Sequence, residues 1–227
     1  MKLKKLVAIT LSAVMCMAAL TGCGGKSDSA KKTAKVIEVD LTDEQYAFGV
    51  DKDQPDLLKE VNQFVKDMKS DGTFDEICNR YFGDGTPVPV KSAAYDESKD
   101  QLVVATNAAF EPFEYMDGEN YVGIDMEIAK ALADKLGKEL VIQNMDFDAV
   151  CLSVGQHKCD VAMAGLTIKP DREEYVAFSD PYYSASQKLI TLSTDTEFDA
   201  CKTADDVNKI LEAKGSDLKI GFQNGTT

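Results

Sequence analysis

The chain has no tryptophan, a single histidine and only two arginines, Arg80 and Arg172, among its 25 basic residues. Its 39 acidic residues leave a net charge of −14 over 227 residues. A chain this acidic cannot neutralise the phosphates of nucleic acid, so nucleic acid is excluded as a partner. Because His157 stands alone and no His/Cys cluster has ligand spacing, neither a metal site nor a cofactor is expected.

The first residues are typical of an exported protein. An apolar run at residues 6–20 follows a basic start, and its length favours a signal peptide over 1–22 rather than a transmembrane helix. The run ends in Leu20-Thr21-Gly22-Cys23, which resembles the lipobox of bacterial lipoproteins. This resemblance implies a lipid on Cys23 and an extracytoplasmic protein anchored to the bacterial cell membrane; a plain secretory signal is the alternative. Residues 23–35 are polar and predict a flexible tether.

Four further cysteines, Cys78, Cys151, Cys159 and Cys201, stand among apolar neighbours in predicted helices or strands. Export permits disulfides, but this setting favours buried free thiols. Neither CxxC spacing nor a Cys/His pair indicates a nucleophile.

The pattern along the chain predicts alternating strands and helices. Before a polar linker at 84–100, a strand is expected at 46–50 and helices at 55–72 and 73–83, with Thr73 as a cap. Strands are then expected at 101–107, 139–145, 159–166, 187–193 and 218–223. Helices are expected at 124–137, capped by Asp125, at 147–156, and at 203–215, starting at Thr203. We expect His157 on an exposed loop between a helix and a strand.

This alternation predicts an α/β fold with a mainly parallel sheet flanked by helices. Ligands of such sheets bind at the carboxyl ends of the strands, where Phe110, Phe147 and Arg172 fall. A guanidinium grips a carboxylate through two parallel hydrogen bonds. The alternative for Arg172 is a surface ion pair with a neighbouring acid, Asp171, Glu173 or Glu174, of little energetic value.

Residues 101–227 resemble the family 3 extracellular solute-binding proteins, the amino-acid-binding components of bacterial ABC importers. The resemblance lies in ATNAAFEPFEY, GIDMEIAKALADKLG, DVAMAGLTIKPDREEYVAFSDPYY and IGFQNGTT, in this order and spacing. It implies a type II periplasmic-binding-protein-like lobe plus the start of a second α/β lobe. The implied function is capture of an amino acid by its α-carboxylate and α-ammonium, for delivery to an ABC permease.

The resemblance also implies which residues bind the ligand: Asn107, Phe110, Phe147, Ala164, Gly165, Thr167, Arg172 and Thr226. Arg172 would clamp the carboxylate with help from Thr226, and Phe110 would stack on the ligand side chain. The main chain at 164–165 and the Thr167 hydroxyl would engage the ammonium and the carboxylate. Asn107 stands where members that bind cationic amino acids have an acid, which favours a polar or neutral ligand.

Residues 41–83 resemble the end of the family's first lobe, although here they precede it. This order implies a circular permutation. The closing segment of lobe 1 would be 36–83, its main part 101–187, and the hinge with a partial lobe 2 would be 188–227. Most of the second lobe, including the acid that pairs with the ligand ammonium, is missing from this pattern. We therefore expect the chain as written to bind weakly or not at all.

Two other functions on the same fold stay open: a cyclic-acid dehydratase-like enzyme and an extracellular ligand-sensing domain. An enzyme needs a general acid or base in the pocket. Asn107, Thr167 and the phenylalanines do not titrate usefully, so no catalytic residue is expected. A sensing domain would need a transmembrane helix after the domain, and the pattern along the chain predicts none.

Overall fold

The computed structural model describes residues 33–223 and 225–226. These residues form two compact units, a larger one of 43–186 with 219–226 and a smaller one of 33–42 with 187–218. The predicted signal peptide, Cys23 and most of the tether lie outside the described residues. Within the described part of the chain, no helix has the length and apolar content needed to cross a membrane.

The larger unit is built on a five-stranded sheet of order β10-β3-β9-β4-β8. Its strands are β3 (Gly49–Asp51), β4 (Gln101–Thr106), β8 (Glu139–Asn144), β9 (Val161–Ala162) and β10 (Val176–Phe178). The central strand β4 runs parallel to both β8 and β9, whereas β3 is antiparallel to its neighbours β9 and β10. The predicted α/β fold is confirmed, with the parallel pairing confined to β8, β4 and β9.

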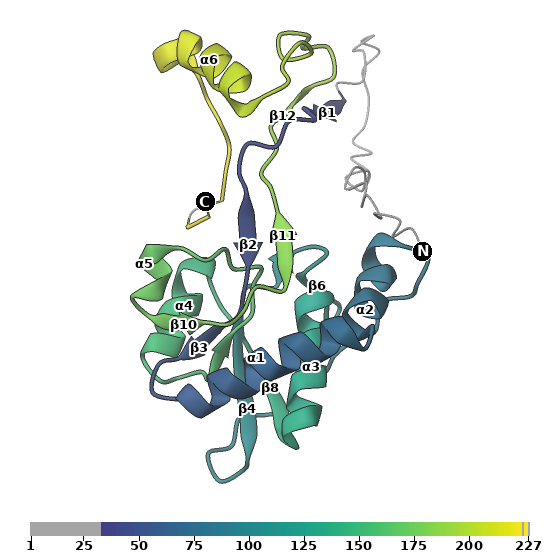
Figure 1. Cartoon of the computed structure of the whole chain (residues 1–227), viewed down its shortest axis with the longest axis vertical. Helices are drawn as coiled ribbons and strands as arrows, with labels where there is room; N and C mark the ends of the chain where they lie inside the picture. The colour runs from purple at the N-terminus through teal and green to yellow at the C-terminus, as the bar shows by residue number, and fades with distance from the viewer. Residues whose placement is uncertain (1–32, 224, 227) are drawn as a thin grey trace, which may run out of the picture. The chain divides into compact units, whose positions relative to one another are not determined.

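Helices cover both faces of this sheet (Figure 1). One face packs against α1 (Pro55–Ser70), α2 (Thr73–Phe82) and α3 (Ile124–Leu136), through Val61, Met68, Ile77 and Leu132 among others. The other face packs against α4 (Phe147–Gly155) through Val150 and Val154. Because side chains alternate along a strand, Leu102 and Val104 of β4 face the first layer and Val103 and Ala105 face α4.

Two small sheets adjoin the larger sheet. β2 (Glu44–Tyr46) pairs with β11 (Tyr183–Ala185), and β5 (Ala109–Phe110), β6 (Glu114–Asp117) and β7 (Asn120–Val122) form an antiparallel meander. The single strand expected at 46–50 is therefore two strands, β2 and β3. They separate at Ala47 and Phe48, whose amides donate to the Leu166 carbonyl and the Ser179 hydroxyl instead of to one ladder.

The smaller unit contains the antiparallel pair β1 (Ala34–Val36) and β12 (Ile190–Leu192), helix α6 (Ala204–Lys214) and the 3₁₀ turn η1 (Gly215–Asp217). Its buried apolar residues are Ile37, Val39, Phe198 and Val207. Thr203 caps α6 as expected, in a capping box with Asp206. The strand expected at 218–223 is wrong, because the described residues after η1 form no ladder. Residues 34 and 35 of the predicted tether belong to β1.

Two predicted caps are also wrong. Gly72 is the N-cap of α2, so Thr73 is already helical, and Gly123 is the N-cap of α3, so Asp125 lies inside its first turn. The 84–100 segment contains no regular element, but Val90 is buried and forms a bridge with Tyr121.

Candidate functional site

The carboxyl ends of β4, β8 and β9 meet at one edge of the sheet, since these three strands are parallel. Asn107 and Phe110 follow β4, Phe147 begins the helix after β8, and the segment from Ala164 to Arg172 follows β9. These predicted ligand-binding residues therefore lie at one edge of the sheet, where ligands of open α/β sheets bind.

Arg172 lies in the short helix α5 (Pro170–Glu173) and is buried, with 8% of its surface exposed. Its Nη1 donates to the Thr167 carbonyl at 2.8 Å and its Nη2 to the Gly225 carbonyl at 2.9 Å. The guanidinium carbon lies 5.2 Å from the centroid of the Phe147 ring, in cation–π range. Arg172 is therefore a packed, oriented side chain, unlike the partner of an exposed ion pair.

Phe110 and Phe113 form an aromatic pair in the segment that follows β4. Their rings are stacked with centroids 5.5 Å apart, and Phe110 is 39% exposed whereas Phe113 is buried. Gly165 lies against Phe110, since a Cβ on Gly165 would be 3.0 Å from the phenylalanine Cε1. Gly165 has φ +53°, in the left-handed region that favours glycine. A glycine here lets the main chain approach the exposed aromatic ring closely.

The amide of Gly165 donates a hydrogen bond to Asp125 of α3. Asp125 is fully buried; its Oδ2 accepts from Gly165 N at 2.9 Å and its Oδ1 from the Tyr182 hydroxyl at 2.5 Å. Burial raises the pKa of Asp125 to about 6, against the opposing effect of these two donors. The Gly165 amide is therefore already bonded within the protein.

Glu114, at the start of β6, is the second fully buried carboxyl of this region. Burial and the neighbouring Asp125 charge raise its pKa well above the ordinary value. Of the two carboxyls, Asp125 is the more readily ionised, because the Gly165 amide and the Tyr182 hydroxyl donate to its oxygens.

The sequence interpretation missed this role of Asp125 by assigning it to a helix cap. A signal was present: Asp125 lies four and seven positions before Ala129 and Leu132, both completely buried on the inner face of α3. An acid on the apolar side of a helical repeat indicates a buried, hydrogen-bonded carboxylate.

The remaining predicted residues have partners within the protein. The Thr167 hydroxyl donates to Glu44 Oε2 at 2.7 Å, and Ala164 is buried. Asn107 donates through Nδ2 to the Met145 carbonyl at 2.7 Å. The Thr226 hydroxyl donates to the Gln223 carbonyl at 2.7 Å, so it caps its own turn.

The four described cysteines are free thiols, as predicted. Cys151 and Cys159 are buried, and Cys78 and Cys201 are half-buried. Burial raises the pKa of Cys151 to about 11 and that of Cys78 to about 12, so neither is a thiolate at neutral pH.

Residues 8–84 and 102–220 match the sequence model of the bacterial extracellular solute-binding proteins, family 3. The chain is 35% identical over 136 residues to the arginine-binding extracellular protein ArtP of Bacillus subtilis, covering 56% of this chain and 53% of that protein. It is 31% identical over 127 residues to a cyclohexadienyl dehydratase of Pseudomonas aeruginosa, covering 54% of this chain and 47% of the relative.

Among solved structures, an ancestral cationic amino acid solute-binding protein is 33% identical and aligns over 49% of this chain and 41% of its own, with a TM-score of 0.36. The chain spans about half the length of the curated relatives it matches.

Proposed function

The chain belongs to the bacterial extracellular solute-binding proteins of family 3, and we propose that it captures an amino acid at the edge formed by β4, β8 and β9. The observation that supports this most is Arg172, a buried guanidinium stacked on Phe147 at the carboxyl ends of parallel strands. The ligand would be held between two lobes by its α-carboxylate and α-ammonium.

Arg172 keeps donors for a ligand carboxylate. A guanidinium has five N–H donors, and among the described residues one hydrogen of each Nη is bonded to a carbonyl. The Nε–H and one hydrogen of each Nη are left, which is enough for a bidentate grip. The two carbonyl contacts fix the plane of the fork before the ligand arrives, so less side-chain entropy is lost on binding.

For the ligand side chain, we propose a polar or neutral amino acid. Phe110 offers a half-exposed ring, and Asn107 beside it has no charge to neutralise a cationic side chain. Curated relatives are named as arginine-binding proteins, so arginine is the competing ligand. Glutamine against arginine is therefore the comparison that tests this part of the proposal.

We propose a binding protein and not an enzyme, although one relative is a dehydratase. The two carboxyls of this region with raised pKa, Asp125 and Glu114, are completely buried and bonded or packed within the protein. A general acid must reach the proton acceptor of its substrate, and neither side chain reaches the surface.

The segment order supports the proposed permutation. Strand β3 lies between β10 and β9 in the sheet, and α1 and α2 cover the same face as α3. Residues 43–82 thus complete a lobe whose other strands come later in the chain. The matched family segments likewise stop at 84 and resume at 102, on either side of the proposed linker.

Delivery to an ABC permease, export and a lipid anchor on Cys23 complete the proposal; ABC transporter proteins are among the relatives. Export and the anchor are tested by expressing the full chain and its Cys23→Ala variant in bacteria supplied with a radiolabelled fatty acid. Label on the wild type alone is the expected result, and label on both variants would contradict the anchor assignment.

Calorimetry of the full chain with a panel of amino acids tests the ligand proposal. Arg172→Ala should weaken binding by at least ~2 kcal/mol, roughly 30-fold, because the ligand carboxylate is left unpaired. Lys169→Ala is the matched control, since Lys169 is a cation three residues away that forms a long ion pair with Asp171 at 3.8 Å. Equal affinity of wild type and Arg172→Ala would contradict the clamp. No binding of any amino acid would agree with the weak binding expected when most of the second lobe is missing from the sequence pattern, and it would contradict capture by this chain alone.

A further inference from the structure

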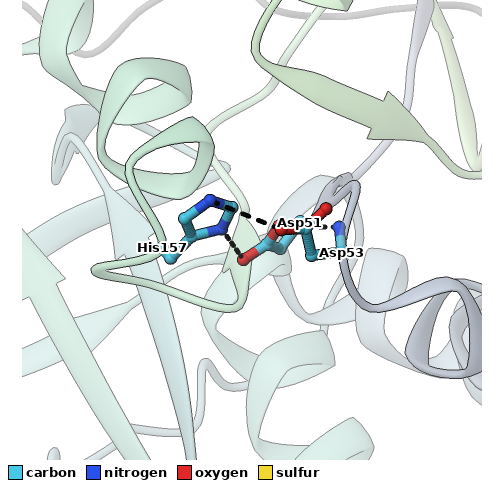
Figure 2. Close-up of side chains that lie close together, drawn as sticks. All are labelled: Asp51, Asp53 and His157. Carbon is cyan, nitrogen blue, oxygen red and sulfur yellow. Dashed lines mark hydrogen bonds and ion pairs between the residues drawn. The ribbon is translucent and has the colours of Figure 1, made fainter.

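The only histidine of the chain lies beside two aspartates from a distant segment (Figure 2). His157 follows α4, Asp51 ends β3, and Asp53 lies in the turn that leads into α1. One donor atom from each of the three side chains lies within 4.8 Å of the others. Spacing along the sequence indicated no metal site, because 104 or more positions separate His157 from the aspartates.

Asp51 orients the imidazole. It is buried, with 3% of its surface exposed; its Oδ1 accepts from the Asp53 amide at 2.9 Å and its Oδ2 lies 2.8 Å from His157 Nδ1. A carboxylate bonded to one ring nitrogen fixes the tautomer and the direction of the other nitrogen, an arrangement that recurs behind histidine ligands of metals.

The other ring nitrogen lies near a second carboxylate. His157 Nε2 lies 3.6 Å from Asp53 Oδ2, and both side chains are solvent-accessible. An ion at an ordinary metal–donor distance of about 2.1 Å from each atom would form an angle of about 120° with them, close to tetrahedral. The remaining positions would be open to water. A simple ion pair needs only Asp51, whereas here a second carboxylate lies opposite the other nitrogen.

The main chain holds both sides of this cluster. The Asp51 amide donates to the Asp160 carbonyl and the Gln54 amide to the Asp51 carbonyl, each at 3.0 Å. The His157 amide donates to the Val154 carbonyl at 2.9 Å. The nearby Lys52 ammonium is bonded to the Glu174 carbonyl.

We propose that His157 Nε2 and Asp53 bind a divalent transition-metal ion, with Asp51 as the residue that orients the imidazole. One imidazole and one carboxylate suit Zn²⁺, Co²⁺, Ni²⁺ or Cu²⁺ and not Mg²⁺ or Ca²⁺, which take oxygen ligands. The site is separate from the proposed amino-acid site, so each can fail without the other.

The test uses the untagged full chain, freed of metal with a chelator, and titration with Co²⁺ and Ni²⁺ followed by calorimetry. His157→Ala and Asp53→Asn should each weaken binding at least tenfold, and Asp51→Asn about tenfold or more, in the range typical of residues behind a ligand. Asp56→Asn is the matched control, because Asp56 is an exposed acid of the same segment that pairs with Lys59. Mg²⁺ and Ca²⁺ should give no comparable binding.

A second measurement does not depend on any variant folding. Since the chain has one histidine, its imidazole protons give unique NMR signals, which substoichiometric Ni²⁺ should broaden selectively. Co²⁺ should give the visible spectrum of nitrogen and oxygen ligands, without the charge-transfer band that cysteine thiolates would add. Unaffected histidine signals, or equal affinity of wild type and His157→Ala, would overturn the proposal and leave an adventitious ion only.

Discussion

Replacing Asp125 with alanine removes the acceptor of two buried donors, the Gly165 amide and the Tyr182 hydroxyl. Leaving a buried donor unpaired costs about 1–3 kcal/mol, so the variant should lose ~2–6 kcal/mol of stability at pH 7. Domains are typically stable by about 5–15 kcal/mol, so this loss is a large fraction. Urea unfolding followed by far-ultraviolet circular dichroism measures it, because the chain has no tryptophan to report.

Glu114→Gln is the control for this prediction. Burial and the Asp125 charge hold the pKa of Glu114 well above its ordinary value, which favours the neutral form of the side chain. Glutamine keeps the shape and a hydrogen-bond donor, and its variant should stay within about 1 kcal/mol of wild type. The reasoning is refuted if Glu114→Gln is as destabilising as Asp125→Ala, or if the alanine variant loses less than ~1 kcal/mol.

The raised pKa of Asp125 also predicts how the stability of the protein changes with pH. The pKa of Asp125 is raised from 3.8 to about 6 in the folded protein, so the folded state binds the proton more tightly than the unfolded state. This contribution to stability is present below about pH 4 and is lost as pH rises through about 6. Two pKa units correspond to about 3 kcal/mol. Asp125→Asn removes this contribution. The unfolding free energy of the wild type minus that of the variant should therefore fall by roughly that amount from pH 4 to 7. A difference that does not change with pH would refute the prediction.

Three further predictions concern single positions. Gly165→Ala forces a Cβ into the left-handed region 3.0 Å from the Phe110 ring; it should lose about 1–2 kcal/mol of stability and weaken amino-acid binding, both measurable on one purified sample by thermal unfolding and calorimetry. Thr203→Ala removes the capping box of α6 and should destabilise that helix by ~1 kcal/mol, seen as faster amide exchange in α6 alone. Leu132→Ala deletes a completely buried side chain of the main core and should lose about 2–5 kcal/mol in urea unfolding, whereas a loss below ~1 kcal/mol would contradict its place in that core.

The helices of the fold could be predicted from the sequence because their signals are local. Pro55 begins α1, Gly137 follows α3 with φ +70°, and Thr203 caps α6 through its own side chain. Each of these residues acts within one turn of its helix, so its signal needs no distant partner.

The strand pairing could not be predicted in the same way. Residues 46–50 are apolar throughout, and nothing in their pattern reveals that Tyr46 pairs with β11 while Gly49–Asp51 enters the large sheet between β9 and β10. The expected strand at 218–223 has the right composition but no ladder among the described residues. Strand formation depends on a partner, and the sequence of one strand does not name it.

The location of the candidate site could be predicted from the sequence, but its hydrogen bonds could not. The strand ends, a property of the fold class, predicted its location, and Phe110, Phe147 and Arg172 do follow those strands in the structure. The hydrogen-bond partners of Gly165 and Thr167 were not predicted, because Asp125 and Glu44 reach them from 40 and 123 positions away. Pairing over such distances leaves only an indirect trace, a polar residue on an otherwise apolar face.

Variants of Arg172 need both their ligand affinity and their unfolding free energy measured, because this side chain contributes to both. Its guanidinium supports two carbonyls and stacks on Phe147, so truncation would loosen the segments at Thr167 and Gly225 as well as remove a ligand contact. A lysine keeps the charge but offers one point donor group, which cannot hold both carbonyls and a carboxylate in one plane. Loss of affinity in Arg172→Lys with unfolding free energy preserved would therefore isolate the fork geometry as the source of binding. Parallel loss of both quantities would instead assign the arginine to the architecture of the strand ends.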